Sequence, residues 1–391
     1  MRKDTSLEFL RGIAALVVLN WHSLLAFAPS AAGVTADSAG QSLKISPAFV
    51  AFNGRAAVYL FFVLSSYVLV KRYYFSRKPE DLLFGAAKRL PRLAGPVLVT
   101  VIASCIVFKL DLYSFADAAA ITRSGWLAAF GDTATVLSSE TANFSDAFMQ
   151  GAWWTFIAGD NSYDSSLWTM TFEFWGSLLA FILAPIVFFL HDRSRLLCWC
   201  AVGVGMVLAW QVSFVFVAFA ASLSLYPLLS SRLRLNAWTR GLLVAASLLL
   251  LGYGGYGVGA YRPLAMLEFD GLSLNLRQAC VAVPASLMLV YAVLSMESPP
   301  SWLSSKAARL VGDLSFPLYL VHVPVICSLG SWALLVSGSA ALGAAAAMLG
   351  SVLVALPLVV FNNWWVRALN SLFDRCRRGA VTATGPVAAK V

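Results

Sequence analysis

Long apolar segments recur along the whole of this sequence, and they constrain its fold more than any other feature. A helix needs a run of about 20 mostly apolar residues to cross the hydrocarbon core of a bilayer. The sequence therefore predicts an all-α integral membrane protein, a polytopic bundle of about ten transmembrane helices. The ten predicted spans are residues 9–28, 56–75, 93–110, 167–190, 196–210, 212–229, 240–256, 279–296, 314–336 and 340–363. The fifth and sixth are the weakest, because Gln211 alone marks a boundary between them, and one long re-entrant hairpin is the alternative.

Composition excludes an ordinary soluble domain. The chain is 60% hydrophobic and 12% charged, whereas soluble domains carry about 25% charged residues. We expect one membrane domain over residues 1–378, followed by a disordered cytoplasmic tail over 379–391. The six cysteines are scattered, and Cys198 and Cys200 are too isolated in sequence to predict a zinc site. No bound metal is expected.

The distribution of basic residues predicts the orientation in the membrane. If the N-terminus is cytoplasmic, 22 of the 28 Lys and Arg fall in inner segments, as the positive-inside rule requires. The other six are Lys44, Arg55, Lys109, Arg123, Arg262 and Arg277. We therefore expect a multi-pass protein of the cell membrane with both termini cytoplasmic and the acidic loop 111–166 outside. The net charge of +9 then reflects topology and attraction to anionic membrane lipids, and no nucleic-acid partner is expected.

Ionisable side chains inside the predicted spans are the first candidates for function, because each costs about 2.5–3.5 kcal/mol to insert. Arg11 and His22 are eleven residues apart in the first span. Eleven residues make almost three helical turns, so both side chains lie on one face, about 16 Å apart along the axis. A cation near the membrane surface suits a phosphate or a thioester carbonyl, and a deeper imidazole suits proton transfer. The structural alternative is that Arg11 extends to the interface beside Glu8 while His22 bonds a backbone carbonyl.

Two further groups lie in later spans. Glu173 is close to the outer end of the fourth span, where it either orients a catalytic group or ties two helices together. Tyr319 and His322 are three residues apart in the ninth span and share a helical face. Pro317 and Pro324 flank them and predict a kink that frees backbone carbonyls nearby. The alternative for this pair is a hydrogen bond that serves helix packing.

Five segments, in this order along the chain, together resemble the acyltransferase type 3 family of integral membrane enzymes. They are residues 7–22 with Arg11 and His22, 61–69, the basic stretch 88–96, 167–178 with Glu173, and 313–324 with Tyr319 and His322. The sequence departs from the family pattern in two places. Ser66 stands where glycine is usual, and residues 174–177 (Phe-Trp-Gly-Ser) replace a commoner, more polar run.

The resemblance implies a membrane-embedded O-acyltransferase that moves an acyl group, expected to be acetyl, from acyl-CoA to a hydroxyl of an extracytoplasmic or lipid-linked saccharide. Arg11 would bind a phosphate or polarise the thioester, His22 would act as general base or carry the acyl group, and Glu173 would fix the imidazole tautomer. The implied site residues are Arg11, His22 and Glu173 as catalytic groups; Ser65, Trp168, Tyr319 and His322 as supporting or acceptor-binding groups; and Lys71, Arg72, Arg89 and Arg92 as donor-binding groups.

A second class of function fits the same intramembrane charges and kinked helices. A transporter of a lipid-linked saccharide or a small anion also needs buried ionisable groups. Dependence on acyl-CoA separates the two hypotheses, because an enzyme alone would bind and consume that donor. The residues fit both direct transfer and an acyl-enzyme intermediate.

Overall fold

The computed structural model describes residues 4–35, 42–231, 235–268 and 272–383, with side chains described as far as Cys376. Most of these residues are helical, and no β-strand occurs among them. Within these described ranges, eight helical segments are long and apolar enough to cross a membrane. They are Thr5–Phe27, Gly54–Ser76, Pro79–Lys109, Ser165–His191, Arg195–Val212, Leu274–Leu294, Lys306–Ser337 and Ala340–Cys376. The predicted all-α polytopic membrane fold is confirmed.

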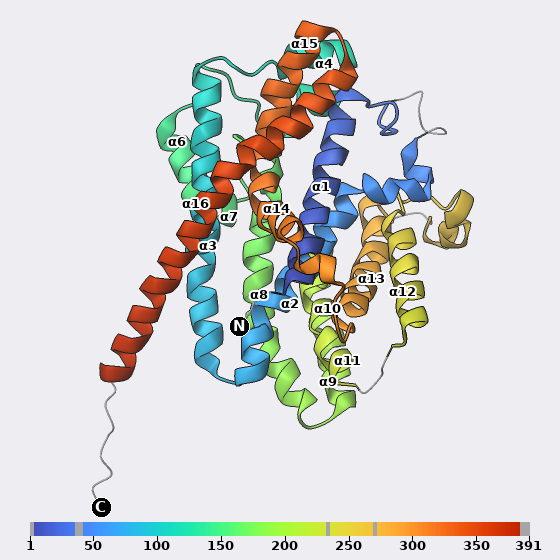
Figure 1. The fold of residues 1–391 in the computed structure, drawn as a ribbon, viewed down its shortest axis with the longest axis vertical. Helices are drawn as coiled ribbons and strands as arrows, with labels where there is room; N and C mark the ends of the chain where they lie inside the picture. Colours follow the sequence, from blue (N-terminus) through green and yellow to red (C-terminus); the bar gives the residue numbers. More distant parts are fainter. Residues whose placement is uncertain (1–3, 36–41, 232–234, 269–271, 384–391) are drawn as a thin grey trace, which may run out of the picture.

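These eight segments contain the long helices shown in Figure 1, and short helices lie between them. The long helices are α1 (Thr5–Phe27), α2 (Gly54–Ser76), α3 (Pro79–Lys109), α8 (Trp168–His191), α9 (Arg195–Val212), α13 (Leu274–Leu294), α14 (Lys306–Val325) with α15 (Ser331–Ser337), and α16 (Ala340–Ala383). The short ones are α4 (Phe115–Thr122), α5 (Gly125–Ala128), α6 (Phe144–Met149), α7 (Thr155–Ile157), α10 (Val217–Ser222), α11 (Leu225–Ser230) and α12 (Ala237–Leu251).

The sixth and seventh predicted spans are the two shortest apolar segments, Phe214–Ser230 and Ala237–Leu251. Fifteen residues of α12 make a helix of about 22 Å, less than the roughly 30 Å of a hydrocarbon core. The helix α9 ends at Val212, and the side chain of Ser213 accepts a hydrogen bond from the N–H of Val215. The fifth and sixth predicted spans are therefore two helical segments separated at this cap.

The last helix is longer than predicted. The apolar run ends near residue 363, but α16 continues to Ala383. The charged and amide side chains after residue 361 end the apolar run, but such residues can still lie within a helix. Residues 379–383, at the start of the predicted tail, are helical, and the remainder of that tail lies outside the described residues. In Figure 1, α16 crosses the bundle diagonally and extends beyond it.

Helices α1 and α14 pack against each other at unusually short range. A Cβ atom on Gly12 would lie 2.2 Å from the backbone oxygen of Val311, and one on Gly312 would lie 3.0 Å from the backbone carbon of Glu8. Glycine at both positions removes the side chains that would hold the backbones apart, as in other membrane helix pairs. This contact brings the α14 residues after Gly312 beside the α1 residues after Gly12.

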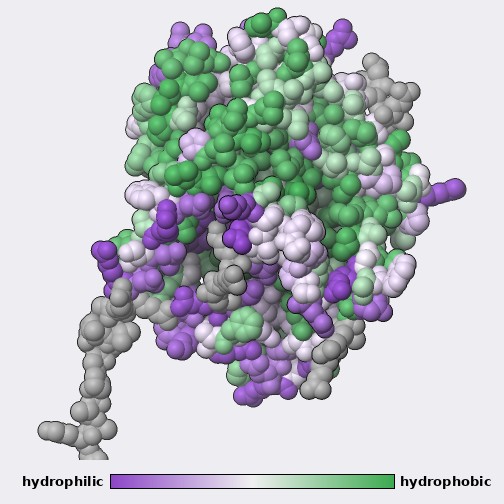
Figure 2. Space-filling view, viewed as in Figure 1, coloured by the Kyte–Doolittle hydropathy of each residue, from purple (hydrophilic) through white to green (hydrophobic). Residues whose placement is uncertain are grey.

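One face of the molecule shows how polarity is distributed. Figure 2 shows a broad hydrophobic surface over its upper and central parts, with hydrophilic residues gathered toward the end at which α16 finishes. We call this the predicted cytoplasmic end, and the other, at which α1 ends and α2 begins, the predicted outer end. The loop between α3 and α8 folds into the short helices α4 to α7.

Candidate active site

A cavity of about 390 Å³ lies among α1, α2, α3, α8, α14 and α16. Along α2 its lining runs from Arg72 to Val58, which are fourteen residues or about 21 Å apart on a helix. The cavity thus reaches from the predicted cytoplasmic end deep into the bundle. Its polar lining includes Arg11, Ser65, Arg72, Asp81, Lys88, Arg89, Arg92, Thr169, Glu173, Ser315, Tyr319, Asn370 and Asp374.

An ion pair between Arg89 and Glu173 lies in the wall of this cavity. The Oγ atom of Ser65 bonds the same carboxylate, and Nε of Arg89 donates to Oγ of Ser177 over 2.7 Å. Arg89 is only 9% exposed, and a charge so deeply buried needs an opposite charge and satisfied hydrogen bonds. The motif around Glu173 therefore supplies both, since Ser177 follows Glu173 by one helical turn.

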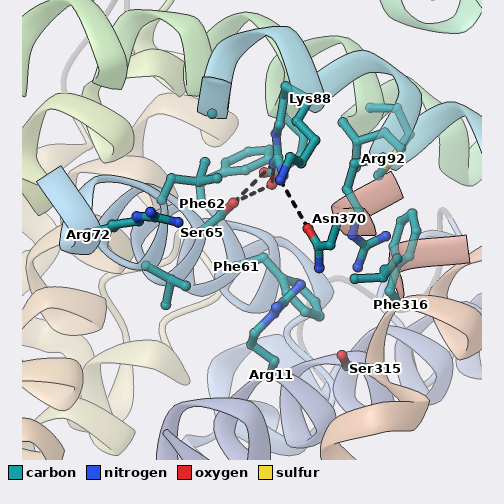
Figure 3. A pocket seen from close by; sticks show the side chains of 18 of the residues that line it. Arg11, Phe61, Phe62, Ser65, Arg72, Lys88, Arg92, Ser315, Phe316 and Asn370 are labelled. Atoms are coloured by element: carbon teal, nitrogen blue, oxygen red, sulfur yellow. Dashed lines mark hydrogen bonds and ion pairs between the residues drawn. The ribbon is translucent and has the colours of Figure 1, made fainter. Parts of the chain in front are cut away.

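Four other basic side chains line the cavity around this pair (Figure 3). Arg72 pairs with Asp81 at 2.9 Å. Arg92 donates to Oδ1 of Asn362 at 2.9 Å and Lys88 to Oδ1 of Asn370 at 3.1 Å.

Arg11 pairs with Glu8 at 3.5 Å, while its Nε is buried and has no partner among the described residues. Arg11 thus pairs with Glu8, as the structural alternative expected, and it also lines the cavity, where it could contact a ligand. The predicted donor-binding residue Lys71 differs from the rest. It does not line the cavity and lies instead 3.8 Å from Asp4.

The carboxyl-terminal part of α16 closes one side of the cavity. Val366, Asn370, Phe373 and Asp374 line it, and Nζ of Lys88 lies 5.2 Å from the ring centroid of Phe373. Sequence reasoning missed this wall by ending the span at residue 363. A signal was present, because residues 362, 366, 370 and 373 repeat at helical spacing and so share one face.

The second group of candidate residues is an imidazole pair. Nδ1 of His22 lies 2.7 Å from Nε2 of His322, and the two ring planes differ by 3°. Nδ1 of His322 lies 2.7 Å from the carbonyl oxygen of Tyr319. A carbonyl only accepts, so Nδ1 of His322 carries a proton, and in the neutral ring Nε2 accepts from Nδ1–H of His22. Nε2 of His22 is then left with a lone pair.

Tyr319 connects the imidazole pair to the cavity. Its side chain lines the cavity, its hydroxyl lies 2.8 Å from Oγ1 of Thr169, and its carbonyl holds His322. The ring of Trp126 stacks on His22 with centroids 5.0 Å apart. A second, smaller cavity also occurs among the described residues, and Trp168 lines it. Neither His22 nor His322 lines either cavity.

The expected contact between Glu173 and His22 is not formed. Glu173 pairs with Arg89, and the partner of His22 is His322, which is 300 residues away in the chain. The reason is steric and topological: the glycine contact of α1 with α14 places His322 beside His22, whereas α8 presents Glu173 to α3.

The two departures from the family pattern have local structural consequences. Oγ of Ser66 donates to the carbonyl of Phe219 over 2.9 Å and accepts from Oγ of Ser222 over 2.6 Å, so its hydroxyl ties α2 to α10. Gly176 makes room for the same phenylalanine, because a Cβ there would lie 2.4 Å from the ring of Phe219. Ser66 and Gly176 therefore accommodate α10, whereas Ser177 holds Arg89 in the cavity wall.

These features define an all-helical, polytopic membrane protein with a deep basic cavity and an imidazole pair, in which His322 is buried and His22 is partly buried. A family model described as an acyltransferase domain matches residues 4–360, so the chain belongs to the acyltransferase type 3 family and is an acyltransferase. It is similar to the O-acetyltransferase PaAT-1 of Phomopsis amygdali, with 24% identity over 382 residues that cover 83% of this chain and 72% of the relative. No solved structure matches. Of the two classes of function that the sequence left open, the family match selects the enzyme.

Proposed function

We propose that this protein is a membrane O-acyltransferase that takes an acyl group, acetyl in the first instance, from acyl-CoA and transfers it to a hydroxyl of an extracytoplasmic or lipid-linked saccharide. The family supports acyl transfer, and the name of the relative supports an acetyl group and an oxygen acceptor. The cell membrane is the proposed location, with both termini in the cytoplasm. Membrane lipids surround the protein and position a lipid-linked acceptor.

One observation carries the donor assignment: a basic cavity about 21 Å deep opens toward the predicted cytoplasmic end. Acyl-CoA carries its phosphates at one end and its thioester at the end of a long pantetheine arm. Arg72, Lys88, Arg92 and Arg11 provide cations for the phosphates near the opening. The apolar side chains Val58, Phe61 and Phe62 line the deeper part, which suits the arm.

Arg89 has a different role in this proposal. Its charge is matched by Glu173 and it is only 9% exposed, so it contributes less to anion binding than Arg92, whose described hydrogen bond goes to a neutral amide. It is a positioning residue, which holds α3 against α8 and keeps the cavity wall in place. Glu173 likewise acts on Arg89 and Ser65, not on the imidazole.

The imidazole pair provides the general base. Nε2 of His22 takes the proton of the acceptor hydroxyl as the oxygen attacks the thioester carbonyl, the new C–O bond forms, and the C–S bond breaks. The CoA thiolate leaves and receives the proton from His22. Nδ1–H of His22 points at His322 throughout, so the positive charge on the protonated ring is stabilised by a neutral acceptor whose own tautomer is fixed by the Tyr319 carbonyl. The separation of Arg11 from His22, about 16 Å along α1, is spanned by the pantetheine arm.

The test uses the full-length protein purified in detergent. Isothermal titration with CoA should show binding that weakens when Arg92 or Lys88 is replaced by Gln, and that is unchanged in the control Arg195→Gln, an exposed arginine on α9. His22→Ala should retain CoA binding and lose transfer from acetyl-CoA. Wild-type protein that does not bind CoA, or that moves a saccharide across proteoliposomes without consuming acyl-CoA, would overturn the proposal.

A further inference from the structure

A second cavity of about 240 Å³ lies at the predicted outer end of the bundle. It forms where α2, α8 and α13 begin, beside the 3₁₀ turn Phe214–Phe216. Val58 and Phe62 line this cavity and also the first one, so the two cavities share a wall. At this size it is smaller than typical ligand sites of about 300–1,000 Å³. It would therefore accept one small group and not a whole cofactor.

The cavity contains a cation that has no ion-pair partner among the described residues. Arg55 lines it and is partly buried, yet none of the ion pairs formed by described residues includes Arg55. Partial burial weakens the hydration of the guanidinium, so an external anion would stabilise it.

A second buried cation lies close to Arg55. Lys44 is 9% exposed and has the ring of Trp21 5.4 Å from its Nζ. Burial and the charge of Arg55 lower the pKa of Lys44, which places the two cations near each other. Both belong to the six basic residues that the predicted topology does not place in inner segments. The positive-inside rule therefore does not account for their presence.

The backbone adds positive potential to the same place. The amino-terminal ends of two long helices, α2 at Gly54 and α13 at Leu274, meet at the cavity. Each such end carries about half a positive charge from the helix dipole. Anions are favoured there.

The remaining lining identifies the rest of the ligand. Trp168, Phe172 and Phe214 present aromatic rings, and Asn275 and Ser213 present polar groups. Trp168 is 38% exposed, so its ring is available for contact. Aromatic rings pack well on the C–H faces of sugar rings, while amides and hydroxyls bond sugar hydroxyls. A cation, an aromatic platform and an exposed amide fit a single acidic sugar residue.

We propose that this second cavity binds the acceptor, and that the acceptor is an anionic saccharide whose carboxylate or phosphate contacts Arg55 while its ring packs on Trp168. This inference rests on the proposed function, which assigns the larger cavity to the donor. The acidic group of the acceptor then lies behind Val58 and Phe62 as seen from the donor cavity, while the hydroxyl that is acylated extends past this wall to the thioester and to His22.

Titration of the purified full-length protein with small sugars tests this. Glucuronate, glucose 6-phosphate and glucose are compared by isothermal titration on wild type, on Arg55→Gln and on the control Arg262→Gln, an exposed arginine outside the cavity. We expect at least one of the two anionic sugars to bind about tenfold or more tightly than glucose, which corresponds to about 1.4 kcal/mol. Arg55→Gln should lose this preference, and Arg262→Gln should retain it. Arg55→Lys keeps the charge and should retain part of it, which guards against a Gln variant that fails to fold.

Several results would overturn the inference. They are equal binding of all three sugars, no binding of either anionic sugar up to its solubility limit, or a preference that survives Arg55→Gln in monodisperse protein. Tight binding of phosphatidylglycerol in mixed micelles without binding of either anionic sugar would assign the cavity to a lipid headgroup instead. CoA titration of the same preparation keeps the two proposals separate, because loss of CoA binding contradicts the donor site and loss of sugar discrimination contradicts the acceptor site.

Discussion

His22 and His322 form one hydrogen-bonded unit, with Nδ1 of the first 2.7 Å from Nε2 of the second and their ring planes parallel to within 3°. The carbonyl of Tyr319 accepts from Nδ1–H of His322, and Nε2 of His322 therefore accepts from Nδ1–H of His22. The glycine contact between α1 and α14 brings the two histidines together. A base assembled in this way depends on helix packing as much as on the imidazole itself.

We expect His322→Ala to lower the turnover number by about 10²-fold, with little change in KM for acetyl-CoA. The variant removes the group that orients His22 but leaves the donor cavity intact. His322→Gln retains an acceptor oxygen and should recover part of the lost rate. Replacing His191, an interface residue whose Nε2 lies 3.3 Å from Ser230, by Ala provides the matched control. A wild-type turnover number in His322→Ala would remove His322 from the mechanism.

Arg11→Lys should be severely impaired although it keeps the positive charge. Lysine is a point charge and cannot present the planar fork of a guanidinium to a phosphate. The effect is measured as transfer rate against acetyl-CoA concentration, beside Arg309→Lys, an exposed arginine on α14. If the two lysine variants behave alike, the role of Arg11 is confined to its pairing with Glu8.

The Arg89–Glu173 pair should couple strongly in stability. Glu173→Gln leaves a buried arginine without its counter-charge, which costs about 3–5 kcal/mol when an ion pair is truly buried. Arg89→Met should also destabilise the protein, whereas Arg89→Met with Glu173→Gln should lose less than the sum of the single changes. Denaturation midpoints in detergent for wild type, both single variants and the double variant complete the cycle. Additive losses would mean that the two residues act independently.

Stability should also depend on the pH through Asp164, which precedes the fourth span. Burial raises the pKa of this carboxyl from 3.8 to about 8, and its Oδ2 is buried without a partner among the described residues. The folded protein therefore holds a proton that the unfolded chain releases above about pH 4. Stability should fall as the pH rises from about 4 to about 8.

Asp164→Asn is neutral throughout this range and keeps an oxygen to accept from the N–H of Ser166. We expect its melting temperature to decline less between pH 5 and pH 8 than that of wild type. Identical pH profiles for the two proteins would show that Asp164 is not protonated in the folded state.

The orientation is tested with single cysteines in a background that lacks the six native ones. An impermeant thiol reagent should label Glu140→Cys in intact cells, because the loop between α3 and α8 is predicted to lie outside. Glu80→Cys, equally exposed at the start of α3, should be labelled after the membrane is opened and not before. The reverse pattern would invert the protein and move the donor cavity away from cytoplasmic acyl-CoA.

Local patterns in the sequence predicted the long helices and seven of the polar side chains that line the cavity. Arg11, Arg72, Arg89, Arg92, Ser65, Glu173 and Tyr319 all line it, because motifs and intramembrane charges mark such residues one by one. Pairing was not predictable in the same way. Whether Glu173 or His322 meets His22 depends on how closely α14 approaches α1. That approach depends on Gly12 and Gly312, whose contact is visible only in three dimensions.

The end of α16 was missed for a different reason. Hydropathy detects lipid-facing helix, and beyond residue 363 the helix turns polar because it forms a wall of the cavity. Helical periodicity at Asn362, Val366, Asn370 and Phe373 persists there. A search for spacing in place of hydrophobicity would have continued the helix.

The shared wall of Val58 and Phe62 has an electrical consequence. In the proposed arrangement the donor and acceptor cavities approach this wall from opposite ends of the bundle and leave little protein between them, so a membrane potential would fall mostly across this thin partition. An acyl group is neutral and can be handed over it without moving charge along the field. Small, uncharged cargo is thus the kind that such a partition can pass while ions, whose transfer into hydrocarbon is very costly, are held back on either side.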